Sequence, residues 1–180
     1  MSIGLAPTFQ EVIMSIQHIQ SILVKICRAG IGIAFCVLLG TVLYQVIGRT
    51  FAISSVWTEE LTRYALLYVA AFGVGLSLLS GDLVNVDVIC EFLPGEWPRR
   101  LRLISASITV VLCLALIGPA WKYTAIGARQ TSPAMGLRMD FVHASVLLLL
   151  LLLLAFAALR VVSMIWDGAS GLPDEKEDYS

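Results

Sequence analysis

Four stretches of eighteen to twenty residues contain no Asp, Glu, Lys or Arg, and they recur along the whole chain. They cover residues 29–48, 64–81, 103–121 and 141–159. Because a helix rises about 1.5 Å per residue, each stretch would form a helix of roughly 27–30 Å, which matches the hydrocarbon core of a bilayer. The sequence therefore predicts an all-α integral membrane protein with four transmembrane helices.

The overall composition agrees with a membrane protein. The mean hydropathy is +0.88, and 58% of the residues are hydrophobic, which is too apolar for a soluble domain of 180 residues. We expect one membrane domain, residues 1–170, followed by an acidic and disordered tail at 171–180. The formal net charge of -1 gives no sign of a nucleic-acid partner, so membrane lipids are the expected surroundings.

Two amphipathic segments flank the predicted spans. Residues 8–26 place apolar side chains at three- and four-residue steps, which predicts an N-terminal interfacial helix lying on the cytoplasmic membrane surface. The alternative is a soluble arm folded back on the bundle. A second short interfacial helix is predicted between spans two and three, where an apolar set precedes Pro94: Leu83, Val86, Ile89, Cys90 and Leu93.

The distribution of Lys and Arg predicts the orientation. The side that holds the N-terminus, the second loop and the C-terminus carries seven of these residues, and the opposite side carries five. Arg99, Arg100 and Arg102 strengthen the bias directly before the third span. We therefore expect both termini in the cytoplasm.

Small residues indicate where helices could approach closely. Gly73, Ser77 and Gly81 recur at four-residue intervals in span two, and span one repeats the pattern at residues 32, 36 and 40. Such stripes serve either packing within the bundle or docking of a partner protein. In span three, Pro119 should kink the helix because it cannot donate to the carbonyl of Ala115.

The predicted spans contain no group that could bind an ion or a polar solute at mid-membrane. His143 lies only at the outer edge of span four, and neither half shows the interrupted helices of an inverted-repeat transporter. The chain alone is therefore not expected to couple transport, and we expect an accessory or scaffolding subunit.

Two classes with redox chemistry are alternatives. A four-span thiol/quinone oxidoreductase needs a close, exposed pair of thiols, whereas the four cysteines here are dispersed and form no C-x-x-C motif: Cys27, Cys36, Cys90 and Cys113. A haem-anchoring subunit needs facing axial ligands, which one span-edge histidine cannot supply. We expect no enzyme activity, no cofactor and no metal site, and keep the oxidoreductase as the alternative.

The densest polar cluster is WTEELTR at residues 57–63, directly before span two. Trp57 suits the membrane interface, and Glu59 and Glu60 fall in the first helical turn, where negative charge is favoured. Glu59 and Arg63 are four residues apart and can pair. By itself the cluster is also typical of a well-capped helix start with an aromatic anchor.

This cluster, followed by Gly73, resembles a motif of the small permease subunit of tripartite ATP-independent periplasmic (TRAP) transporters. GDLVNVD at 81–87 and QTSPA at 130–134 resemble further motifs of that family, in the same order and spacing. The resemblance covers roughly residues 28–160. Leu83 departs from it, because family members often carry His at that position.

The resemblance implies a bacterial inner-membrane subunit in stable complex with a large permease that holds the substrate and sodium sites. It also implies a transient contact with a periplasmic substrate-binding protein during sodium-coupled uptake of an organic acid or similar small solute. The small subunit would be a fixed scaffold. The predicted partner interface comprises Trp57, Glu59, Glu60, Arg63, Gly73, Ser77, Gly81, Asp87 and Arg129.

Overall fold

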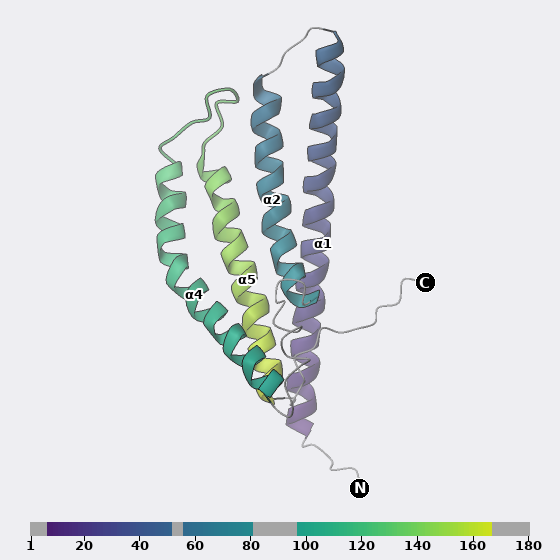
Figure 1. The fold of residues 1–180 in the computed structure, drawn as a ribbon, viewed down its shortest axis with the longest axis vertical. Coiled ribbons are helices and arrows are strands. Elements are labelled where there is room, and N and C mark those ends of the chain that lie inside the picture. Colours follow the sequence, from purple (N-terminus) through teal and green to yellow (C-terminus); the bar gives the residue numbers. More distant parts are fainter. Residues whose placement is uncertain (1–6, 52–55, 81–96, 167–180) are drawn as a thin grey trace, which may run out of the picture.

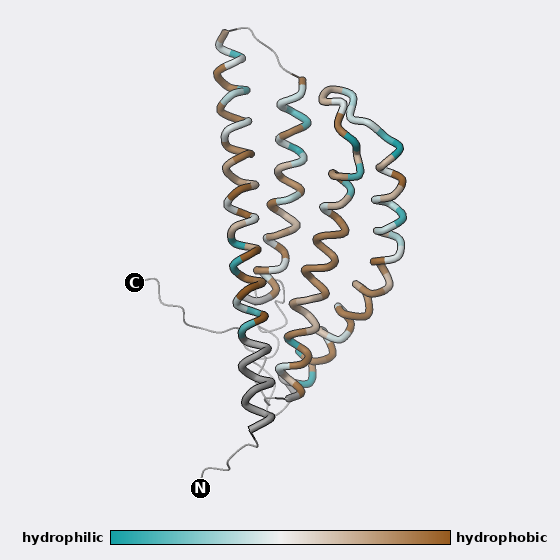
Figure 2. The backbone as a smooth tube through the Cα atoms, turned by 180° about the vertical axis from the view of Figure 1, so that it is seen from behind, coloured by the Kyte–Doolittle hydropathy of each residue, from teal (hydrophilic) through white to brown (hydrophobic). Residues whose placement is uncertain are grey.

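The structure, a computed structural model, describes residues 7–51, 56–80 and 97–166. It contains four long helices: α1 (Pro7–Thr50), α2 (Val56–Ser80), α4 (Trp97–Gly127) and α5 (Asp140–Trp166) (Figure 1). All four are long and apolar enough to cross a membrane, which confirms the all-helical prediction of four spans. Figure 2 shows the hydrophobic residues along the helices and more hydrophilic ones toward the helix ends.

The helices stand in a row in the order α1, α2, α5, α4 (Figure 1). Among the described residues, α4 packs only on α5, and α1 packs mainly on α2. One apolar cluster, around Cys27, Leu78 and Phe156, joins α1, α2 and α5, and a second around Cys113 and Leu150 joins α4 and α5. Because a row has two broad faces, many large apolar side chains remain exposed for lipid or another protein.

The N-terminal interfacial helix is a prediction that the structure corrects. Residues 8–26 form the first part of α1, which continues without a break to Thr50. Nothing in the sequence interrupts backbone hydrogen bonding between this segment and the span, since no proline lies there. Leu23 and Val24 pack against the cluster that contains Cys27, so part of the amphipathic face contacts the protein itself.

The predicted irregularity in span three is present. Pro119 lies inside α4, and α4 bends along its length in Figure 1. A proline lacks the N–H that would bond the preceding turn and its ring crowds the carbonyl four residues back, which accounts for a bend in an otherwise continuous helix.

The glycines that permit close packing differ from those predicted. A β-carbon added at Gly32, Gly40 or Gly73 would meet no atom within 4 Å, so these positions do not bring described helices together. Gly75 does: a β-carbon there would lie 2.8 Å from Cε2 of Phe156, which is 1% exposed. The α2–α5 contact therefore uses Gly75, two residues from the predicted stripe.

Several predictions fall outside the described residues. These are the interfacial helix between spans two and three, the tail at 171–180, and Gly81, Asp87 and Cys90. The three described cysteines are free thiols; Cys27 and Cys113 are buried and Cys36 is exposed.

Candidate functional site: a loop clamped to the start of a span

The segment between α4 and α5 folds into a tight reversal. Ser132 N donates to Leu137 O at 2.8 Å, Gly136 N donates to Ser132 O at 3.0 Å, and Thr131 and Arg138 form an antiparallel bridge. Gly136 has a φ of 65°, in the left-handed region where a side chain costs energy. The loop's own hydrogen bonds therefore fix its shape.

Glu60, in the first turns of α2, binds this loop. Its Oε2 accepts a hydrogen bond from Ser132 Oγ, and its Oε1 accepts one from Ala134 N at 3.3 Å. Ser132 Oγ also accepts from Met135 N at 3.2 Å, and Ser132 is only 3% exposed. Hydrogen bonds to a carboxylate are stronger than those between neutral groups, so Glu60 ties two segments that are 72 residues apart in the sequence.

Two tyrosines on α2 extend the contact. The Tyr64 hydroxyl lies 3.5 Å from Glu60 Oε2 and 3.6 Å from Met139 Sδ. The Tyr68 hydroxyl donates to Phe141 O at 2.6 Å, in the first turn of α5. Residues four apart share a helix face, so all three side chains reach the same neighbour. We call Glu60, Tyr64 and Tyr68, with their partners at residues 132–141, the loop clamp.

The end of α4 and the start of α5 pack closely beneath the loop. The rings of His143 and Tyr123 stack with centroids 3.9 Å apart, and His143 Nδ1 lies 3.1 Å from Tyr123 O. Because a carbonyl oxygen can only accept, Nδ1 of His143 is the donor in this contact. A β-carbon at Gly127 would lie 2.4 Å from His143 Nδ1 and 2.9 Å from Asp140 N, so only glycine permits this approach.

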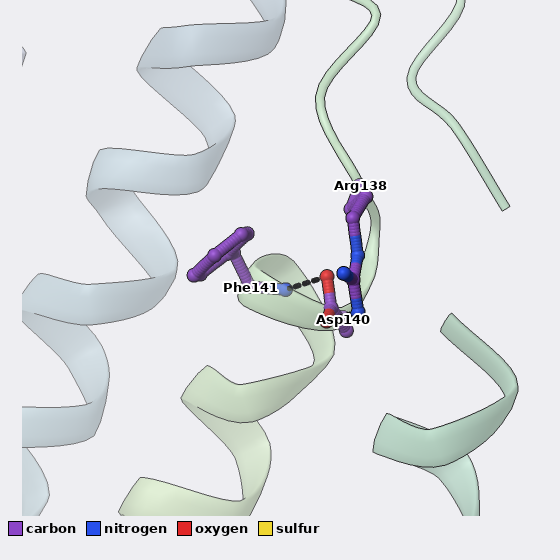
Figure 3. Close-up of polar contacts among 3 residues, drawn as sticks. All are labelled: Arg138, Asp140 and Phe141. Atoms are coloured by element: carbon purple, nitrogen blue, oxygen red, sulfur yellow. Dashed lines mark hydrogen bonds and ion pairs between the residues drawn. The ribbon is translucent and has the colours of Figure 1, made fainter. Parts of the chain in front are cut away.

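An acidic residue starts α5 (Figure 3). Asp140 Oδ1 accepts from Phe141 N at 3.1 Å, and Asp140 Oδ2 pairs with Arg138 Nη2 at 2.7 Å. Negative charge in the first turn is favoured by the helix dipole. Since Arg138 is 60% exposed, the ion pair itself contributes little to stability.

The other predicted site residues near the loop are exposed. Trp57 packs on Tyr44 of α1, with ring centroids 5.5 Å apart, and is itself exposed. Glu59, Arg63 and Arg129 are exposed, and no ion pair joins Glu59 to Arg63 in the described structure. These side chains border the clamp without taking part in it.

The structure thus brings one predicted site residue, Glu60, into the clamp. Gly73 and Ser77 lie farther along α2, away from the loop end. Tyr64, Tyr68 and a role for Ser132 were missed by the sequence analysis. The signal available for the tyrosines is their four-residue spacing from Glu60 along an otherwise apolar span.

The clamp is suited to positioning and carries no obvious reactive chemistry. It offers one carboxylate, one serine hydroxyl and two phenols, all engaged with the loop or with α5. Within residues 7–51, 56–80 and 97–166, no three His, Cys, Asp or Glu side chains gather as metal ligands. What the arrangement does is hold a loop in one shape against the start of a span.

Fold and site define a small multi-pass membrane protein with a fixed loop at one end. Residues 38–167 match the family of the tripartite ATP-independent periplasmic transporters, DctQ component, and the chain belongs to this family. Two Haemophilus influenzae proteins described as TRAP transporter small permease proteins are similar to it. They are 26% identical over 113 residues and 24% identical over 109 residues, which cover 62% and 61% of this chain and 68% of each relative.

The chain is therefore a small permease component of a bacterial TRAP transporter and not an enzyme, so the oxidoreductase alternative is wrong. As one component of a tripartite system, it has the other TRAP subunits as partners.

Proposed function

We propose that this chain is the fixed scaffold of its TRAP transporter, in stable complex with the large permease. It would also help dock the periplasmic binding protein during sodium-coupled uptake of an organic acid or a similar small solute. The four stretches at 29–48, 64–81, 103–121 and 141–159 support a scaffold role because they contain no Asp, Glu, Lys or Arg that could hold an ion or a charged solute at mid-membrane. The exposed apolar faces of the helix row suit contact with a larger membrane protein and with lipid.

The observation that carries the docking role is the loop clamp. A loop that receives a soluble partner binds more tightly when its bound shape is already fixed, because less conformational entropy is lost on binding. Glu60 fixes the loop through Ser132 and Ala134, and exposed charged residues surround it: Glu59, Arg63 and Arg129. We assign these four charged residues and Trp57 to the docking face.

The docking role requires the loop clamp to face the periplasm. The loop clamp and the start of α2 lie at the end of the row opposite the start of α1 (Figure 1). With both termini in the cytoplasm, as the Lys and Arg bias predicts, this end faces the periplasm. Arg129→Cys in a cysteine-free background should react with a membrane-impermeant thiol reagent added outside the inner membrane. Labelling only from the cytoplasmic side would reverse the assignment.

The central test compares Glu60→Ala with Glu59→Ala, which removes the same charge from the adjacent, exposed position. Each variant is expressed with the large permease and the binding protein, and both solute uptake and co-purification are measured. We expect Glu60→Ala to reduce uptake several-fold and Glu59→Ala to have a smaller effect. Wild-type uptake by both variants would remove Glu60 and its clamp from the docking role.

A double-variant cycle links the effect to the clamp. Ser132→Ala removes the hydroxyl that donates to Glu60, and we expect it to resemble Glu60→Ala. If the two side chains act through one contact, the double variant should be no worse than the more severe single variant. Additive losses would mean that Glu60 and Ser132 act separately.

A further inference from the structure

The end of the helix row that holds the loop clamp, which we call the loop end, is more basic than acidic (Figure 1). Eight charged residues lie there, and the structure describes all of them: Arg49, Glu59, Glu60, Arg63, Lys122, Arg129, Arg138 and Asp140. Five are basic and three are acidic, so the loop end has an excess of two positive charges. The whole chain has a net charge of -1, so the rest of the chain is net negative.

Two of the three acidic side chains at the loop end are already engaged within the chain. Glu60 accepts hydrogen bonds from the side chain of Ser132 and the backbone of Ala134. Asp140 pairs with Arg138 and accepts a hydrogen bond from the first turn of α5. Glu59 is the one acidic side chain of the eight charged residues that the structure leaves exposed.

The basic side chains, in contrast, are directed outward. Four of them are exposed and form no ion pair within the described parts of the chain: Arg49, Arg63, Lys122 and Arg129. Arg49 lies in the last turn of α1, Arg63 in α2 and Lys122 in α4. Arg129 follows the end of α4, in the loop itself. The accessible charge around the loop clamp is therefore mainly positive.

This positive charge needs an explanation if the loop end faces the periplasm. Lys and Arg beside a span favour the cytoplasmic side, whereas Asp and Glu have little influence on orientation. A periplasmic end that only required hydrated side chains could therefore use acidic ones without weakening the topology. The loop end uses mostly basic ones, which indicates that the sign of the charge is itself needed.

We propose that the loop end docks the periplasmic binding protein through an acidic face of that protein. This inference rests on the docking role proposed above and adds the charge of the partner surface. Arg63 and Arg129 pair with carboxylates of the partner, and Glu59 opposes its approach. Complementary charge raises the rate of encounter and excludes partners of the wrong sign. The attraction acts over a Debye length, about 10 Å at 0.1 M salt.

A protein partner fits this surface better than anionic lipid does. The negative surface potential that attracts basic segments to lipid belongs to the cytoplasmic leaflet. The exposed cations are also accompanied by exposed Trp57 and Trp121. Arg and Trp are the side chains most enriched where one protein binds another tightly.

Binding of the purified binding protein to the complete membrane complex tests the proposal. The wild-type chain and the large permease are placed together in nanodiscs of phosphatidylcholine, which has no net charge. Biolayer interferometry gives the Kd in potassium chloride at about 0.1 M and about 1 M, where the Debye length falls to about 3 Å. We expect the Kd to rise at least about five-fold at the higher salt, because each exposed ion pair contributes about two- to five-fold.

The outcomes separate this inference from the docking role. A Kd that does not change with salt would overturn the charge of the partner surface and leave docking intact. Binding that appears only after phosphatidylglycerol is added would show that the basic residues serve lipid, and would also overturn the inference. No binding in either lipid would overturn the docking role and the inference with it.

Variants of opposite sign locate the effect. Arg63→Gln and Arg129→Gln should each raise the Kd about two- to five-fold at the lower salt and have little effect at the higher salt. Glu59→Gln should lower the Kd, and damage to the fold cannot produce that result. Lys25→Gln removes an exposed positive charge at the opposite end of the row and should leave the Kd unchanged. Weaker binding by Glu59→Gln, or an equal loss with Lys25→Gln, would refute an acidic partner surface at the loop end.

Discussion

Gly127→Ala tests the packing beneath the loop most directly, because the geometry leaves the new methyl group no space. It would lie 2.4 Å from His143 Nδ1 and 2.9 Å from the backbone N of Asp140. The His143 ring cannot swing away without losing its stack and its hydrogen bond with Tyr123, and a backbone atom cannot move alone. Overpacking of this kind costs about 1–3 kcal/mol.

Gly118→Ala is the matched control. It makes the same substitution in the same helix, at a position where a β-carbon meets nothing within 4 Å. The comparison sets the steric cost at Gly127 against the general effect of replacing a glycine of α4 by alanine, which is worth about 0.5–1 kcal/mol in a helix interior.

Thermal unfolding of the two purified variants in the same detergent gives the measurement. At about 2–4 °C per kcal/mol for a chain of this size, Gly127→Ala should unfold roughly 2–12 °C below Gly118→Ala. Equal midpoints would show that α4 and α5 can separate at this end without cost. The packed contact between the end of α4 and the start of α5 would then not be a rigid support for the loop.

Two further predictions concern other glycines. Gly136→Ala should lower the stability of the loop by about 1–2 kcal/mol because φ is 65° at this position. Gly136→Asn should cost less because asparagine tolerates the left-handed region. Amide hydrogen exchange at residues 130–139 should therefore rise in Gly136→Ala and stay near wild type in Gly136→Asn. Equal hydrogen exchange in the two variants would show that the left-handed backbone at Gly136 is not what makes its replacement costly. Gly75→Ala should lower the unfolding midpoint by crowding Phe156, whereas Gly73→Ala should not, and a reversed order would contradict the α2–α5 contact.

The sequence predicted which segments form helices better than it predicted where the helices begin and end or which residues contact each other. The four charge-free stretches give the spans because the need to bury backbone polar groups in lipid leaves few alternatives. The same patterning placed a helix over residues 8–26 but could not show that this helix continues into the first span as one element, α1. An amphipathic pattern shows which side of a helix is apolar, but it does not show how that helix is oriented relative to the next one. No residue between the two segments shows whether the helix ends or continues there.

Contacts between distant segments were harder to predict. WTEELTR and QTSPA were both recognised as motifs, yet the hydrogen bond from Ser132 to Glu60 joins residues 72 apart, and a single sequence contains no signal that pairs them. Of the two roles open to the small-residue stripe, packing within the bundle does not hold at Gly73, where a β-carbon meets no atom within 4 Å, and partner docking stays a prediction. Which glycine faces α5 depends on the rotation of α2 about its axis, and Gly75 is the one that meets Phe156.

The position of the loop clamp within the helix row bears on how a scaffold could respond to a docked partner. The clamp joins α2 to α5, and these are the two helices that have a packed neighbour on each side. The same pair meets again lower down, where Gly75 admits Phe156 into the largest apolar cluster. A push on the loop would therefore pass into the two central helices, each of which is packed on both sides. A clamp built between α4 and α5 alone would load an edge helix that has Pro119 in its interior. The central placement suits a subunit that stays still while its neighbour moves.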